Sequence, residues 1–92
     1  LMDELDILRE KVNAVDKELA KLFEERMKLI KDIAKRKKEI NYPVYDQGRE
    51  TFLLIRNGSY IEDKEIRVLY FELLNKIFEL SKKMQENIIH SK

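Results

Sequence analysis

The chain has 92 residues and no cysteine, and its 19 Lys and Arg residues nearly balance its 18 Asp and Glu residues. The absence of cysteine excludes disulfides, thiolate metal sites and a cysteine nucleophile, and the near-zero net charge argues against a general nucleic-acid binder. No apolar run approaches the roughly 20 residues of a membrane span, and no signal-peptide pattern is present, so we expect a cytoplasmic protein. We expect one domain over residues 1–92, of a size at which oligomerisation often adds stability.

A long helix is predicted over about residues 3–40, a stretch without Gly or Pro. Its apolar residues recur three or four positions apart, as on one helix face, at Leu5, Leu8, Val12, Val15, Leu19, Leu22, Leu29 and Ile33. Such a helix is roughly 55 to 60 Å long, whereas a compact monomer of this chain length has a radius of gyration of about 12 Å. We therefore expect a dimer, in which a second chain covers the part of the helix that extends beyond its own monomer.

Two cations interrupt this apolar face. Continuing the spacing from Leu22 leads to Arg26, and continuing it from Ile33 leads to Lys37. Burial of an unpaired cation costs several kcal/mol, so we expect an anionic group to face them. The other cations near this helix end are expected to be solvated and to complement the helix dipole; they are Lys28, Lys31, Lys35, Arg36 and Lys38.

Two further helices follow a connector that contains Pro43. A short helix is expected over about 46–57, with Asp46 as its N-cap and Gly58 as its C-cap. A third helix is expected over about 63–87, with the wide apolar stripe of a bundle core. Ser81 and Gln85 interrupt that stripe and lie on one face, because they are four positions apart. The predicted fold class is all-α, with a long, a short and a long helix.

Eight polar residues are candidates for a site, and several of them lie on or beside faces that should point inward. They are Arg9, Arg26, Lys37, Asp46, Arg49, Glu50, Ser81 and Gln85. A pocket of cations and neutral donors suits a small ligand with more than one carboxylate, because guanidinium groups bind carboxylates in a bidentate manner. The sequence offers no nucleophile–base pair, metal-ligand cluster or Gly-rich phosphate loop. An enzyme built on these residues is expected to use no cofactor and to work by positioning and electrostatic stabilisation.

Each of these residues, taken singly, also fits an ordinary structural role. Arg9 and Arg49 fit surface ion pairs worth less than about 1 kcal/mol, and the side chains of Arg26 and Lys37 are long enough to reach water. Gln85 fits a residue that sets the register of a helical bundle. A helical dimerisation module without catalytic activity is therefore an alternative on these residues alone.

The chain resembles the all-helical class of chorismate mutases over nearly its whole length. The resemblance is carried, in order, by Leu8-Arg9-Glu10-Lys11, Val15-Asp16-Lys17-Glu18-Leu19, Glu25-Arg26, Ile33-Ala34-Lys35-Arg36-Lys37, Pro43-Val44-Tyr45-Asp46-Gln47-Gly48-Arg49-Glu50 and Ser81-Lys82-Lys83-Met84-Gln85. Its most specific parts are the cations of the first helix, the Asp-x-x-Arg-Glu pattern after Pro43 and the Ser-x-x-x-Gln pattern near the end. It implies an intertwined homodimeric helical bundle, in which each active site takes one residue from the partner.

The resemblance also implies roles for individual residues. Arg26 of one chain and the partner's Arg9 would hold the two carboxylates of chorismate, assisted by Ser81. Lys37 and Gln85 would point at the ether oxygen and act as the catalytic residues.

Three further residues have implied roles on the other side of the substrate. Glu50 and the backbone near Asp46 would bind the ring hydroxyl, and Arg49 would support the site. No metal is implied.

The reaction implied is the Claisen rearrangement of chorismate to prephenate, catalysed by an isomerase of the shikimate pathway that leads to phenylalanine and tyrosine. It needs no cofactor. Isochorismate pyruvate lyase is a nearby alternative, because it shares the fold and the cationic pocket; Arg49, Glu50 and Gln85 favour the mutase.

Overall fold

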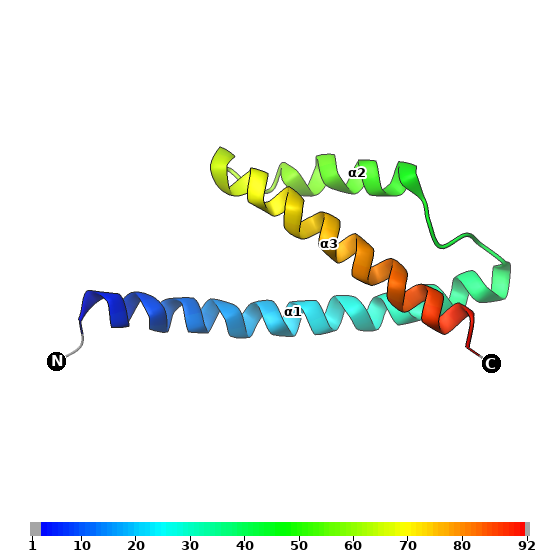
Figure 1. The fold of residues 1–92 in the computed structure, drawn as a ribbon, viewed down its shortest axis with the longest axis horizontal. Coiled ribbons are helices and arrows are strands. Elements are labelled where there is room, and N and C mark those ends of the chain that lie inside the picture. The colour runs from blue at the N-terminus through cyan, green and yellow to red at the C-terminus, as the bar shows by residue number, and fades with distance from the viewer. Residues whose placement is uncertain (1–2, 92) are drawn as a thin grey trace.

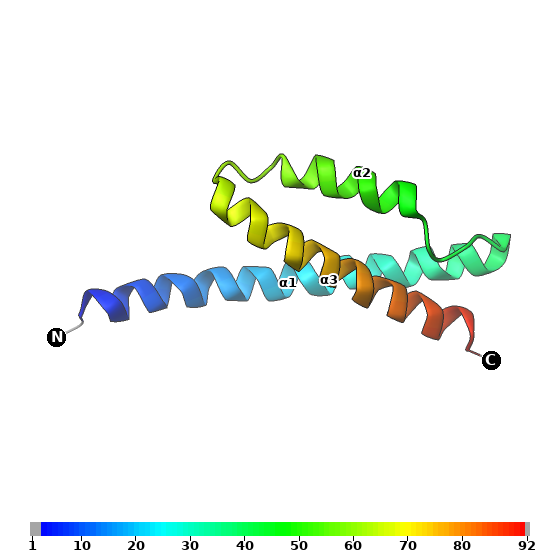
Figure 2. The same ribbon diagram turned by 45° about the horizontal axis from the view of Figure 1, so that its top comes forward.

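The computed structural model describes residues 3–91, which form three α-helices and no strand. The helices are α1 (Glu4–Ile40), α2 (Gln47–Gly58) and α3 (Lys64–Ile89). Figure 1 shows α3 running obliquely from the end of α2 to the C-terminal half of α1, so that α3 packs against both other helices. The same arrangement is seen from a second direction in Figure 2. The all-α class with a long, a short and a long helix is confirmed.

Each helix begins at an aspartate whose carboxylate accepts a backbone N–H of the first turn. Asp3 accepts from Glu4 at 2.7 Å, and Asp46 accepts from Arg49 at 2.9 Å. Asp63 caps α3 in the same way. Such caps satisfy donors that have no partner inside the helix, so the sequence fixes all three starting points locally.

Gly58 does not cap α2, and that prediction was wrong. The helix continues through Gly58, whose φ is not positive, and the C-cap is Ser59 in the right-handed helical region. Gly58 is buried against α3, where a Cβ atom would lie 2.5 Å from Cε1 of Phe71. The residue is therefore suited to a close approach of two helices rather than to a left-handed turn. α3 also ends at Ile89, two residues beyond the expected end.

The interior of the chain is small. Its buried apolar side chains are Met27, Ile30, Ala34, Leu74 and Phe78, which lie where α1 and α3 cross. The radius of gyration is 17.0 Å and the longest extent is 59 Å, whereas a compact chain of this length has a radius of gyration of about 12 Å. The chain is thus an elongated assembly of helices with little core of its own.

The N-terminal half of α1 extends away from α2 and α3 (Figure 1). Its apolar face is open to solvent in the single chain: Val15 is 58% exposed and Leu22 is 60% exposed. Leu5, Leu8, Val12 and Leu19 are exposed on the same face. In the part of the chain that the structure describes, no helix has the length and apolarity needed to cross a membrane.

Candidate functional site

A pocket of about 430 Å³ lies among α1, α2, α3 and the connector between the first two helices. It is lined by Arg26, Leu29, Ile30, Ile33, Lys37, Tyr42, Val44, Asp46, Arg49, Glu50, Leu53, Phe78, Ser81, Lys82 and Gln85. Seven of the eight candidate residues from the sequence are among them, and Arg9 is not. The size and the mixture of apolar walls with a few polar groups are typical of a small-molecule site.

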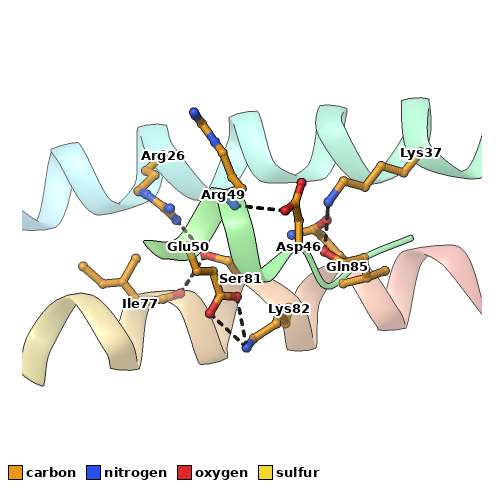
Figure 3. A network of polar contacts seen from close by, with 10 residues as sticks. Arg26, Lys37, Asp46, Arg49, Glu50, Ile77, Ser81, Lys82 and Gln85 are labelled. Atoms are coloured by element: carbon orange, nitrogen blue, oxygen red, sulfur yellow. Dashed lines mark hydrogen bonds and ion pairs between the residues drawn. The ribbon is translucent and has the colours of Figure 1, made fainter. Parts of the chain in front are cut away.

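Arg26 and Ser81 form one polar pair in this pocket. An Nη of Arg26 donates to Oγ of Ser81 at 2.6 Å, and Ser81 donates in turn to the carbonyl of Ile77 at 2.7 Å (Figure 3). Ser81 therefore makes the backbone hydrogen bond of an ordinary helical serine and also holds a guanidinium. Burial lowers the pKa of Arg26 below its ordinary value, and the electrostatic effect of Tyr70 opposes that shift. The guanidinium nevertheless stays protonated at neutral pH. The result is a partly buried cation on the pocket wall.

Lys37 and Gln85 form a second pair further along the same two helices. The Lys37 ammonium donates to Oε1 of Gln85 at 2.8 Å and to the carbonyl of Val44 at 3.0 Å. Gln85 is 5% exposed. Burial lowers the pKa of Lys37 below its ordinary value, and the nearby Asp46 carboxylate opposes that shift. Lys37 is thus a cation in a partly desolvated place, held by neutral acceptors rather than by a carboxylate.

The start of α2 supplies the opposite wall. Asp46 uses its carboxylate to cap the helix, so its position is fixed by the backbone of Arg49. The Arg49 guanidinium lies over the ring of Phe52, 5.9 Å from its centroid, and the side chain is exposed. Neither Asp46 nor Glu50 forms an ion pair with Arg49 within residues 3–91. The surface ion pairs considered for Arg49 from the sequence are thus not formed within residues 3–91.

Glu50 pairs instead with Lys82, a pocket residue that the sequence did not single out. Their atoms Oε2 and Nζ are 3.1 Å apart (Figure 3). Lys82 follows Ser81 directly and looks like an ordinary exposed lysine in the sequence. Its partner is 32 residues away, so no local pattern identifies the pair.

Arg9 lies apart from the other candidates. It is exposed near the start of α1, in the segment that extends away from α2 and α3. It forms no ion pair with Glu10 or Asp16 in the part of the chain that the structure describes. Within one chain, Arg9 therefore does not contribute to the pocket.

The pocket has a clear charge preference. Its cations Arg26, Lys37, Arg49 and Lys82 outnumber its acids Asp46 and Glu50 by two. Four of its polar side chains are fixed by the two hydrogen bonds between α1 and α3 described above. No three His, Cys, Asp or Glu side chains within residues 3–91 are grouped to hold a metal ion. The arrangement can bind a small dianion and place donors against fixed points of it.

Comparison with known proteins gives one consistent family. The model of the family "Chorismate mutase type II" matches residues 8–86. A chorismate mutase of Methanocaldococcus jannaschii is 28% identical over 78 residues, which cover 80% of this chain and 79% of that protein.

A second relative is a bifunctional chorismate mutase/prephenate dehydratase of Aquifex aeolicus, 29% identical over 92 aligned positions. These positions cover 91% of this chain and 25% of that protein, so the chain spans about a quarter of its length. No solved structure gives a significant match. Because the family model covers most of the chain, including the pocket residues on all three helices, the chain belongs to the chorismate mutase type II family, whose members are isomerases.

Proposed function

We propose that this chain converts chorismate to prephenate, in the pathway to phenylalanine and tyrosine. In this rearrangement the ether C–O bond breaks while a C–C bond forms within the same molecule, so no atom is gained or lost and no nucleophile is needed. The observation that carries the proposal is the pocket itself, in which Arg26–Ser81 and Lys37–Gln85 hold donors in place on two walls. Donors that are already oriented need no reorganisation during the reaction.

One end of the substrate is held by its two carboxylates. Arg26, positioned by Ser81, binds one of them, and the partner's Arg9 binds the other. The short Arg26–Ser81 hydrogen bond supports this role, because it directs a guanidinium at the pocket and leaves its remaining donors for a ligand. Arg26 is also too deeply placed to be a simple surface cation.

The reacting bonds lie between Lys37 and Gln85. Negative charge grows on the ether oxygen as its C–O bond breaks, and the Lys37 ammonium and the Gln85 amide nitrogen donate to it. Such interactions are stronger in the transition state than in the ground state, so they raise kcat. Partial burial strengthens them, because charge is less screened where water is excluded.

The wall at the start of α2 binds the ring. Glu50 accepts a hydrogen bond from the ring hydroxyl, together with the backbone beside Asp46. Arg49 supports the site from its rim, where its guanidinium lies on Phe52.

We further propose an intertwined homodimer in which the first helices of two chains cover one another. The exposed apolar face of α1 supports it, since Leu8, Val15 and Leu22 have no cover in the single chain and burial of apolar area stabilises association by about 25 cal/mol per Å². The dimer also brings the partner's Arg9 to a pocket that lacks it. We propose one domain for the whole chain; the cytoplasmic location stays a prediction.

The test is the loss of chorismate absorbance with purified protein, with the products separated. The proposal predicts prephenate, formed at least a hundredfold more slowly by Gln85→Ala in a protein that keeps its helical content and oligomeric state. With isochorismate supplied in a parallel assay, release of pyruvate by a protein that forms no prephenate from chorismate would indicate the lyase. A folded dimer with no turnover would leave a dimerisation module without catalytic activity.

A further inference from the structure

The ion pair between Lys82 and Glu50 differs from every other ion pair recorded in residues 3–91. The others join residues three or four positions apart in the sequence, and their side chains are 51% to 74% exposed. Lys82 and Glu50 come from α3 and α2, with side chains 34% and 24% exposed. Exposed pairs of the first kind contribute little, whereas a partly buried pair between helices constrains both of its members.

Lys82 also contacts the connector that leads into α2. Its ammonium lies 4.7 Å from the centroid of the Tyr45 ring, within the range of a cation–π interaction. It reaches both oxygens of Glu50, at 3.1 Å and 3.5 Å. One side chain of α3 therefore contacts both the connector and a carboxylate in the first turn of α2 that faces the pocket; Figure 3 shows its contact with Glu50.

We infer that Lys82 is a positioning residue for substrate binding, which fixes the Glu50 carboxylate as the acceptor for the ring hydroxyl. The inference rests on the proposed function. Glu50 lines the same pocket as Arg26 and Lys37, and a free carboxylate there would repel a dianionic substrate. Lys82 neutralises Glu50 and holds its carboxylate at the wall, so that a neutral hydroxyl can approach it.

The position of Glu50 relative to the reacting bonds decides whether loss of its hydrogen bond changes KM or kcat. The ring hydroxyl lies outside the bonds that break and form, and it gains no charge during the reaction. Its hydrogen bond to Glu50 is therefore about equally strong in the ground state and the transition state, and losing it raises KM more than it lowers kcat. Lys37 and Gln85, in contrast, act on kcat.

The experiment measures KM and kcat for chorismate in Lys82→Met, Lys82→Arg and the matched control Lys83→Met. Lys83 is the next residue, is exposed and undergoes the same change of charge. We expect Lys82→Met to raise KM about tenfold with kcat within about threefold of the wild type. Lys82→Arg keeps the pair and stays near the wild type, and Lys83→Met leaves both parameters unchanged.

The same substitution is then made in a Glu50→Gln background. If Lys82 acts through Glu50, Lys82→Met adds no further rise in KM there, because the group that it positions has been removed. A tenfold rise that persists in Glu50→Gln would mean that Lys82 acts by its charge alone and would overturn the inference. A KM of Lys82→Met within twofold of the wild type would overturn it too. A wild-type protein without turnover would overturn the proposed function, and this inference with it.

Discussion

Lys37 on α1 and Gln85 on α3 are joined by a hydrogen bond of 2.8 Å across 48 positions of the chain. A lysine ammonium only donates, so Oε1 of Gln85 faces Lys37 and the amide nitrogen is turned away from it. Lys37 is held on its other side by the carbonyl of Val44. The two side chains orient one another before any ligand enters, which is the condition for electrostatic catalysis without reorganisation.

The ionisation of Lys37 gives a prediction on pH. Burial lowers the pKa of Lys37, so kcat/KM, which reports on the free enzyme, is expected to fall on the alkaline side below the ordinary lysine value of about 10.5. Lys37→Arg should move this fall to higher pH, since guanidinium stays protonated. The measurement is the pH profile of kcat/KM for both proteins.

Stability should change in the opposite sense over the same pH window. The lowered pKa means that the unfolded chain binds more protons than the folded chain between the folded pKa and the ordinary one, so this residue's contribution to stability rises with pH there. Activity should therefore be lost while the protein stays folded, as followed by circular dichroism. An alkaline limb that is unchanged in Lys37→Arg would assign the titration to another group.

Because α2 approaches α3 closely at one end only, replacing its two glycines by alanine should change the free energy of unfolding differently. Gly58→Ala places a methyl group 2.5 Å from Phe71, which must move, and should lower the free energy of unfolding by about 1–3 kcal/mol. Gly48→Ala is the control, because its nearest neighbour, the Asp46 carboxylate, is 3.5 Å away. It should be neutral or stabilise the protein by up to about 1 kcal/mol.

Both glycine variants are compared by denaturant unfolding at one protein concentration, since the stability of the proposed dimer would depend on concentration. Equal stability of Gly58→Ala and the wild type would show that the two helices are not packed as closely as described.

If each site takes its Arg9 from the partner, two variants that are each impaired should restore activity to one another when mixed. Arg9→Ala and Arg26→Ala should each bind chorismate weakly. Mixed dimers made by co-refolding should regain about one quarter of wild-type activity, because half of the dimers are mixed and each has one intact site. Neither substitution lies in the core, so both proteins should fold. If Arg9 served its own chain, every site would carry one lesion and mixing would restore nothing.

Much of the fold could be predicted from local signals. The apolar spacing of α1, the Asp46 cap and the Pro43 connector are properties of short segments, and each helix begins one residue after its expected start. Seven of the eight candidate residues line the pocket, because polar residues on an apolar helix face must meet partners where two such faces pack.

The rest depends on contacts between distant segments, which no short pattern encodes. The sequence around Gly58 is typical of a C-cap. The structure shows instead that Gly58 leaves room for Phe71 of α3, which is 13 positions further along the chain. Lys82 has no distinguishing neighbour in the sequence, and its role follows from the placement of Glu50 and Tyr45. The proposed contribution of Arg9 to a site would depend on a second chain, which no pattern in one sequence places.

The proposed role of Lys37 in the reaction is tested by comparing the kcat of Lys37→Ala with that of Lys35→Ala. Both remove one cation from the same helix, but Lys35 is exposed and lines no part of the pocket. We predict that kcat falls at least a hundredfold in Lys37→Ala, a loss of about 3 kcal/mol of transition-state stabilisation, and is unchanged in Lys35→Ala, with both proteins helical and dimeric. A folded Lys37→Ala protein with wild-type kcat would show that Lys37 does not stabilise the transition state.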